Sequence, residues 1–419
     1  MKGIAPTIGW VVLGLALLLS FGVDLYNTSL GGAIDLRNRI TGARLLAHDI
    51  DAWHYKWHEP DPQQYCDPYN NPNLPVSKTT ATPALLLLHL PVALLPYRLG
   101  QLLWLLVQWA LLLGAGWLWL RRCETSRQRW LVALFLAGFT YTASWRLHAE
   151  RGQAYVLLLF LFACWLAATL STTWGNRFWI GLLAGFLATL RPPFLLLVPF
   201  LAFHRRGQLP GFVAGLLLGI ALPMIWQPAC WPDYFSAMQT NSFIYRSDFT
   251  PHNPQAWPDR IEDIPTVDIL ASYVPIAYAD FSVHAFLRWF GFAPFPDLPV
   301  LLAAVVPFGV WLCYSRKLPA ENLLPGLAAW FFLIDLFLPA FRDSYNDVLI
   351  INVVALALIS SNRFPWAAWP CVSALPVGWA IYAFSPEQAW LINLPALFFT
   401  LGSVLVVFLF NNRATARKL

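Results

Sequence analysis

The chain has 419 residues and a formal net charge of +5; 58% of its residues are hydrophobic, only 12% are charged, and 22 are Trp. Soluble domains carry about a quarter charged residues, so this composition excludes a soluble globular enzyme, a disordered tail and a disulfide scaffold. It predicts an all-α polytopic membrane protein. The positive charge alone would suggest an acidic partner, but its distribution along the chain is more informative than its size.

Apolar runs that are candidates to cross or enter a membrane occur twelve times, which predicts about 12 transmembrane helices. They are Ile8–Phe21, Leu102–Leu120, Trp130–Trp145, Tyr155–Leu170, Phe178–Leu190, Phe194–Phe203, Phe212–Trp226, Leu298–Tyr314, Leu323–Leu338, Val348–Ile359, Trp366–Phe384 and Ala389–Phe410. Several are short, which indicates packed interior helices or tilted partial spans. A further run, Pro83–Leu95, is bounded by Pro83 and Pro96. We expect it to be re-entrant, interfacial or a kinked lead-in to the next span.

Basic residues near the span ends predict the side of the membrane on which each loop lies. If Lys2 is inside and residues 83–120 cross once, every later basic cluster also falls inside. Residues 27–82 and 227–297 then form two large outer loops, which carry 14 of the 22 acidic residues. The sequence therefore predicts one transmembrane domain, 1–419, in a bacterial inner membrane, with both loops periplasmic and both termini cytoplasmic.

The first outer loop contains a predicted helix. From Ile34 to Leu46 the apolar residues recur at helical spacing, which indicates an amphipathic helix on the outer membrane surface. Asp35 lies in its first turn, where the helix dipole favours a carboxylate. Two interpretations of Asp35 remain open, a helix cap without chemistry and a site residue.

Two shorter outer turns are unusually polar. The turn after the third run holds His148, Glu150 and Gln153, more polar groups than a turn requires. The other turn, Arg342–Asp347, follows Asp335, an acidic residue inside an apolar run. Intramembrane acids generally face a polar interior and have a partner. Arg342 is the candidate partner, although Pro339 could break the helix between the two residues.

The cysteines and the second outer loop offer weaker signals. The six cysteines form no CxxC motif and no His/Cys ligand pattern, so no zinc site and no cofactor are predicted. Cys66 and Cys230 both lie in outer loops and could pair, or could be unrelated thiols. In the second loop an acidic cluster could bind a divalent cation or form a solvated face; it comprises Asp259, Glu262, Asp263 and Asp268.

Several motifs, taken in order, resemble the integral-membrane glycosyltransferases of the GT-C superfold, and family 87 in particular, the polyprenol-phosphate-mannose-dependent mannosyltransferase-like proteins. An Asp follows the first span and opens an Arg-bearing helix that ends in Leu45-Leu46. The later pieces are Thr82-Pro83 with Leu95-Pro96, Gly152-Gln153, Arg191-Pro192-Pro193 (Lys is usual at the first position) and Arg205-Arg206. In family 87 the turn at 344–347 tends to carry Ser-Trp and two His, whereas this chain has Ser-Tyr-Asn-Asp, so the donor sugar stays open.

The resemblance implies transfer of a hexose, such as mannose, from a polyprenyl-phosphate donor to a lipid or glycan acceptor at the outer face. An inverting in-line displacement needs one carboxylate to accept the proton of the acceptor hydroxyl. It also needs cationic donors for the departing lipid phosphate. By resemblance and position Asp35 is the candidate base, with Asp49 and Asp51 as rivals.

Candidate binding residues follow from the same chemistry. Arg191 is the leading phosphate ligand because Pro192 and Pro193 would start a helix beside it. Further candidates for the phosphate are Arg37 and Arg342. Candidates for the acceptor or the sugar are Gln153, His148, Glu150, Tyr55, Trp57, Tyr345 and Asn346. Partners would be the membrane, the donor lipid and the acceptor, with no nucleic acid.

Two other classes of function are compatible with a polytopic membrane protein. A lipid-linked glycan flippase or polymerase, or another transporter, is the main alternative, and a non-enzymatic membrane scaffold is the third. A transporter commonly places functional charges at mid-membrane within paired repeats. Here the charge-rich turns gather at one predicted interface, which favours surface chemistry on a membrane-held substrate.

Overall fold

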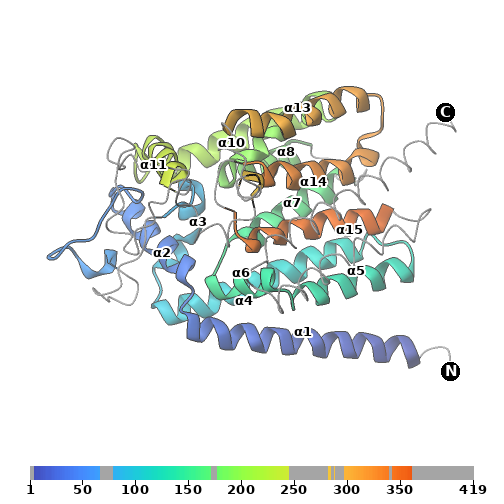
Figure 1. The fold of residues 1–419 in the computed structure, drawn as a ribbon, viewed down its shortest axis with the longest axis horizontal. Helices are drawn as coiled ribbons and strands as arrows, with labels where there is room; N and C mark the ends of the chain where they lie inside the picture. Colours follow the sequence, from blue (N-terminus) through green and yellow to red (C-terminus); the bar gives the residue numbers. More distant parts are fainter. Residues whose placement is uncertain are drawn as a thin grey trace.

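Figure 1 shows the computed structural model of the chain, which is helical throughout its described residues. The structure describes residues 4–66, 79–170, 177–244, 282–284, 287, 297–338 and 342–360, and this part contains no strand. Four of its helices are long and apolar enough to cross a membrane. They are α1 (Ile4–Gly31), α4 (Tyr97–Leu120), α10 (Leu209–Met224) together with the 3₁₀ turn that precedes it from Arg206, and α13 (Asp297–Ser315). The chain is therefore a helical membrane protein.

The other apolar segments form shorter helices. α6 (Ala143–Arg151) and α7 (Tyr155–Leu170) pass the same test only as a pair, bent by 111° at the break between them. The remaining helices are α2 (Ile34–Ala47), α3 (Pro83–Ala93), α5 (Ser126–Phe139), α8 (Arg177–Leu190), α9 (Leu197–His204), α11 (Cys230–Ile244), α14 (Ala320–Leu336) and α15 (Ile350–Ser360). Short 3₁₀ helices are η1 (Gln63–Tyr65), η2 (Pro192–Leu196), η3 (Arg206–Gln208) and η6 (Ser344–Leu349).

One predicted span is broken in the structure. The apolar run Trp130–Trp145 forms parts of two helices, α5, which ends at Phe139, and α6. The hydroxyls of Thr140 and Thr142 donate to carbonyls in the last turn of α5, and Thr142 also caps the start of α6. Pro83–Leu95 forms the separate helix α3, which packs on α2. The last two predicted runs, Trp366–Phe384 and Ala389–Phe410, lie outside the described residues.

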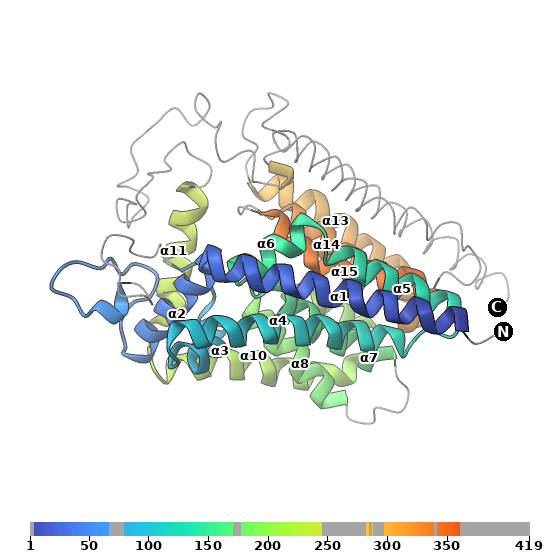
Figure 2. The same cartoon turned by 90° about the horizontal axis from the view of Figure 1, so that it is seen from below.

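The elements assigned to the outer side gather at one end of the bundle. In Figures 1 and 2 α2, α3 and α11 lie together at the end where α1 finishes, opposite the N-terminus. The turns from α4 to α5 and from α13 to α14 lie at the N-terminal end. The ring of Trp53, in the segment after α2, lies 6.1 Å from that of Tyr234 on α11. The first and second predicted loops therefore meet, in their described parts, over the same end of the bundle.

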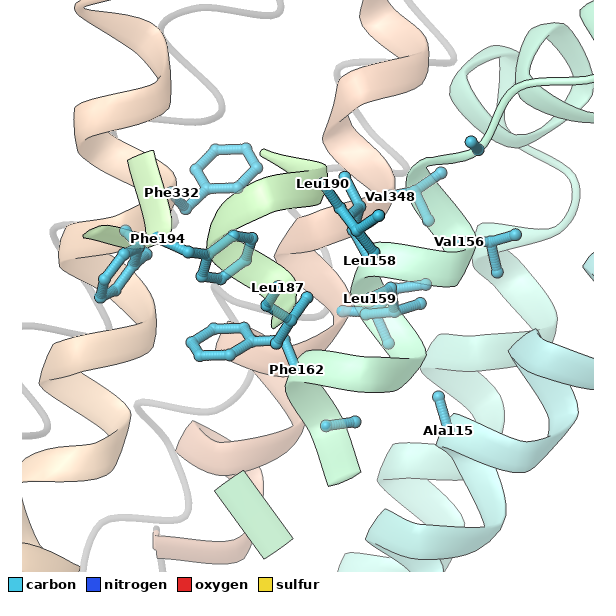
Figure 3. Close-up of a cluster of buried hydrophobic side chains, with 14 of the residues drawn as sticks. Ala115, Val156, Leu158, Leu159, Phe162, Leu187, Leu190, Phe194, Phe332 and Val348 are labelled. Carbon is cyan, nitrogen blue, oxygen red and sulfur yellow. The ribbon is translucent and has the colours of Figure 1, made fainter. Parts of the chain in front are cut away.

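The centre of the bundle is filled by aromatic and aliphatic side chains from α7, α8, η2 and α14 (Figure 3). The ring of Phe194 lies 5.1 Å from Phe162 and 5.4 Å from Phe331. Inside a membrane such contacts stabilise helix association through close packing, because lipid tails are as apolar as the side chains. This core fixes η2, and with it Arg191, against α7 and α14.

The helices α8 and α10 approach each other backbone to backbone. A Cβ placed on Gly181 or Gly185 would lie 1.9 Å from a carbonyl oxygen of the facing segment, and one on Gly211 or Gly215 would lie 1.9–2.0 Å from one. The small-xxx-small spacing of these glycines is what close packing of membrane helices requires. The pair sets the position of the end of α8, directly before Arg191.

Candidate functional site

The turn between α1 and α2 sets the position of Asp35. Gly32 and Ala33 both adopt left-handed backbone conformations, with φ of 72° and 52°. The hydroxyl of Tyr97 on α4 donates to the carbonyls of both residues. Ala33 is the N-cap of α2 and provides no side-chain cap. The Asp35 carboxylate is therefore not a helix cap and is directed to another segment.

That segment is the end of α6. The Asp35 Oδ2 atom lies 2.5 Å from Arg151 Nε and 2.5 Å from Gln153 Nε2, and Arg151 Nη2 lies 3.3 Å from Oδ1. A bidentate guanidinium and an amide donor fix both the position and the orientation of the carboxylate. The side chains of Asp35 and Arg151 remain 17% and 33% exposed, so a substrate can reach them.

Arg39 completes this cluster. It lies one turn after Asp35 on α2, donates to the carbonyl of Gly152 at 3.0 Å and also donates to Gln153 Oε1. Gly152 ends α6 with φ of 69°, and a Cβ on it would stand 2.7 Å from the Cβ of Leu36. The Gly-Gln pair thus combines a close approach to α2 with a ligand for the Asp35 carboxylate. Arg39 was not among the predicted site residues.

Arg191 belongs to a second charged cluster, most of which is buried. Arg191 pairs with Asp335, whose other oxygen lies 3.2 Å from Arg342 Nε. Arg342 Nη2 lies 2.7 Å from Asp347. The side chains of Asp335, Arg342 and Asp347 are at most 2% exposed, whereas that of Arg191 is 17% exposed. The prediction that Asp335 pairs with Arg342 is confirmed. Arg191 is the most exposed member of the cluster.

Two tyrosines join the clusters. The Arg151 guanidinium lies 5.6 Å from the ring centroid of Tyr345, whose ring lies 5.7 Å from that of Tyr155. The guanidinium of Arg191 in turn lies 4.8 Å from the Tyr155 ring. Cation–π contacts of this kind hold both guanidinium groups along one aromatic surface. A continuous series of contacts therefore links Arg151, the partner of Asp35, to Arg191. Tyr155, the first residue of α7, was missed by the sequence analysis.

Titratable groups outside the spans show the electrostatics of this surface. Burial raises the pKa of Asp343, in the turn before η6, to about 6; the positive charge of Arg151 opposes this shift and the negative charge of Asp35 adds to it. Burial also raises the pKa of Tyr234 on α11 to about 12, against the charge of Arg191. Asp343 therefore lies within the field of Arg151, and Tyr234 within that of Arg191.

The polar residues of the first loop mainly stabilise the loop itself. Tyr55 donates to Asp61 Oδ2 at 2.9 Å, and Trp57 donates to the Asp61 carbonyl. Asp51 accepts from the backbone of Trp53 and from His54 Nδ1 at 2.6 Å. Although burial raises the pKa of Asp51, these hydrogen bonds bring it below its ordinary value. Asp49 is exposed, with φ of 57°.

The other predicted residues divide between interior and surface. His148 is buried, its Nε2 accepts from the backbone N–H of Val156 at 3.1 Å, and its ring stacks on Trp145. Asn346 is buried in η6, while Arg37 and Glu150 are half-buried. The structure has no disulfide between Cys66 and Cys230, which agrees with the alternative of two unrelated thiols.

No group of three or more His, Cys, Asp or Glu side chains is placed to hold a metal ion among the residues that the structure describes. The predicted acidic cluster in the second loop lies outside them. It comprises Asp259, Glu262, Asp263 and Asp268.

Comparison with known proteins gives one match. The model of glycosyltransferase family 87 matches residues 80–339, more than half of the chain. This range covers α3 to α14 and includes Gln153, Arg191 and Asp335; Asp35 precedes it. No curated protein and no solved structure matches the chain.

Proposed function

Because the chain belongs to glycosyltransferase family 87, we propose that it transfers a hexose, such as mannose, from a polyprenyl-phosphate donor to a lipid or glycan acceptor. The transfer takes place at the outer face of a bacterial inner membrane, with both termini cytoplasmic. The observation that supports this proposal is the series of contacts that links Asp35 to Arg191 through Arg151, Tyr345 and Tyr155. A base and a phosphate ligand on one surface are the two parts that such a transfer needs.

Asp35 is the base in this mechanism. The acceptor hydroxyl gives its proton to the Asp35 carboxylate while its oxygen attacks the anomeric carbon. Arg151 and Gln153 hold the carboxylate through three hydrogen bonds, two to Oδ2 and one to Oδ1, which leaves a lone pair on Oδ1 for the incoming proton. Attack from the face opposite the leaving group inverts the anomeric centre.

Arg191 receives the leaving group. The bond between the anomeric carbon and the phosphate oxygen breaks with its electron pair on the phosphate, which leaves without being protonated. A guanidinium has five N–H donors, so Arg191 can hold Asp335 and a phosphate oxygen together. Arg342, by contrast, is enclosed between Asp335 and Asp347. We therefore assign phosphate binding to Arg191 and positioning of Asp335 to Arg342.

Transfer can be measured in membranes with radiolabelled polyprenyl-phosphate mannose. Asp35→Asn should abolish transfer and leave the thermal unfolding temperature unchanged, whereas Arg191→Lys should raise the KM for the donor lipid. Asp49→Asn, on the exposed segment after α2, is the matched control and should transfer normally. Full activity of Asp35→Asn would remove Asp35 as the base. Transfer from a soluble nucleotide-sugar would overturn the donor, and movement of the lipid without a new glycosidic bond would favour a flippase.

A further inference from the structure

The fully buried positions of α1 are polar. Within residues 7–30 the buried positions are Ser20, Asp24 and Thr28, each four residues after the last. Many large apolar side chains of the helix are turned outward; Leu18 and Leu19, for example, are 67% and 69% exposed. Leu17 and Phe21 are partly buried against the core. Residues four apart lie on one face of a helix. We call Ser20, Asp24 and Thr28 the polar seam of α1.

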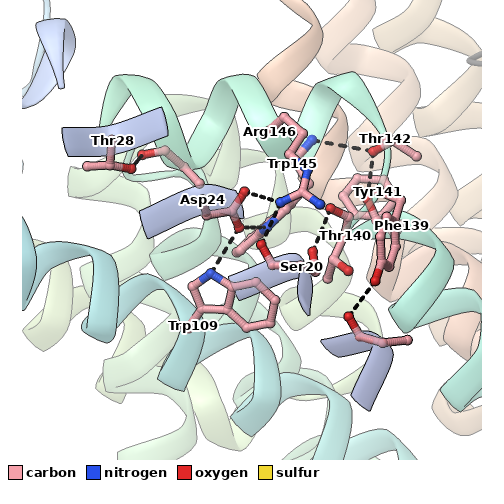
Figure 4. Close-up of polar contacts among 12 residues, drawn as sticks. Ser20, Asp24, Thr28, Trp109, Phe139, Thr140, Tyr141, Thr142, Trp145 and Arg146 are labelled. Carbon is pink, nitrogen blue, oxygen red and sulfur yellow. Dashed lines mark hydrogen bonds and ion pairs between the residues drawn. The ribbon is translucent and has the colours of Figure 1, made fainter. Parts of the chain in front are cut away.

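Asp24 is the centre of this seam (Figure 4). Its carboxylate is fully enclosed and accepts from Trp109 Nε1 on α4 at 3.0 Å and from Trp145 Nε1 on α6 at 2.8 Å. It also pairs with Arg146 of α6. Arg146 donates in addition to the carbonyl of Ser20 at 2.6 Å. Four donated hydrogen bonds therefore tie one turn of α1 to two other helices.

The polar seam and the Asp35 cluster connect the same two segments, residues 20–35 and residues 146–151. Asp24 pairs with Arg146, the Thr28 hydroxyl donates to the carbonyl of Ala149 at 3.5 Å, and Asp35 pairs with Arg151. The contacts follow the same order along both stretches. Apolar helix faces in lipid can slide past each other at little cost, whereas a buried ion pair with directed hydrogen bonds specifies one register.

We propose that the buried Asp24–Arg146 pair is a positioning device that sets the register of α6 on α1, so that Arg151 and Gln153 hold Asp35. The inference rests on the proposed role of Asp35 as the base. Asp24 and Arg146 do not touch substrate; they act through α6. Misplacement of a reacting group by about 1 Å can cost about a hundredfold in rate, so loss of the pair should lower kcat more than it changes KM.

The test uses a double variant because a single change would leave an unbalanced charge inside the membrane. Asp24→Asn with Arg146→Gln removes both charges and retains hydrogen-bonding groups. Tyr141→Phe is the matched control. It removes another α1 contact, the hydrogen bond from Tyr141 to the carbonyl of Ala16, and retains the ring, which lies 5.3 Å from the Arg146 guanidinium. Both proteins are purified as full chains. Each is compared with wild type only after its thermal unfolding shows that it is folded.

Two measurements decide the outcome. An apolar carbodiimide labels accessible carboxyl groups without any substrate, and mass spectrometry quantifies the label on Asp35. In the double variant we expect Asp35 labelling to rise several-fold and kcat to fall at least tenfold with KM within twofold; the control should match wild type in both. Unchanged Asp35 labelling would overturn the proposal, whatever happens to kcat. If no sugar transfer is detected in any protein, the proposed function fails while labelling still tests the positioning.

Discussion

Gly152 lies so close to Leu36 that a Cβ on the glycine would stand 2.7 Å from the Cβ of Leu36. This contact brings the end of α6 against the first turn of α2, which contains Asp35. The Gly152 carbonyl also accepts from Trp104 Nε1 at 3.0 Å and from Arg39. A residue with a side chain cannot occupy this position unless α6 or α2 moves.

Gly152→Ala should therefore impair transfer more than folding. A left-handed backbone costs a residue other than glycine about 1–2 kcal/mol, and the contact with Leu36 forces the end of α6 outward. We expect kcat to fall at least tenfold while most of the protein remains folded. The matched control is Gly138→Ala on α5, where a Cβ meets nothing within 4 Å. Equal activity of the two variants would contradict the role assigned to the contact.

The ring of Tyr345, rather than its hydroxyl, should matter for the site. It lies between the guanidinium of Arg151 and the ring of Tyr155. Tyr345→Phe retains both contacts and should transfer at close to the wild-type rate. Tyr345→Ala removes cation–π and ring contacts of about 0.5–2 kcal/mol, so we expect kcat/KM to fall about 2- to 30-fold. A loss in the Phe variant as large as in the Ala variant would instead assign the role to the hydroxyl.

Much of the site could be predicted because polar residues stand out in an apolar chain. Gln153, Arg191 and Asp335 lie beside an apolar run or inside one, where burial of a polar group needs a reason. Asp35 was identified by its place in the first turn of a predicted helix and by the family resemblance. The helix around Asp35 was predicted as 34–46 and is observed as Ile34–Ala47. What no single run reveals is the partner, because Arg151 and Asp35 are 116 residues apart.

The misses have physical causes as well. Asp24 was passed over because it follows the first apolar run and was counted as neither span nor loop, yet it is buried. Tyr155 looked like an ordinary aromatic residue at the start of a span. The break after Phe139 was missed because hydropathy does not register hydroxyls that donate to nearby carbonyls.

The close packing of α8 on α10 predicts a stability effect without a direct effect on chemistry. A Cβ on Gly185 would lie 1.9 Å from the carbonyl oxygen of Phe212, so Gly185→Ala must push the helices apart. Overpacking of this kind costs about 1–3 kcal/mol or more. We expect a lower unfolding temperature in detergent and a lower folded yield. Gly22→Ala on the exposed side of α1, where a Cβ meets nothing within 4 Å, should lower neither.

Asp343 should make stability fall as the pH rises. Its pKa is raised from 3.8 to about 6, chiefly by burial, so the folded state holds a proton that the unfolded chain has released. The stabilisation is complete below pH 3.8 and is lost as the pH rises through 6; a shift of this size corresponds to about 3 kcal/mol at most. Asp343→Asn carries no titrating group and should remove this dependence.

The prediction can be checked by thermal unfolding in detergent at pH 4.5, 6 and 7.5. The Asp343→Asn protein should gain in unfolding temperature relative to wild type as the pH increases, with the largest difference at pH 7.5. Asp51, whose pKa is lowered, drives stability in the opposite direction, but it is present in both proteins and cancels in the difference. Glu124→Gln, at an exposed carboxyl before α5, should run parallel to wild type. Parallel curves for Asp343→Asn and wild type would show that burial does not hold a proton on Asp343.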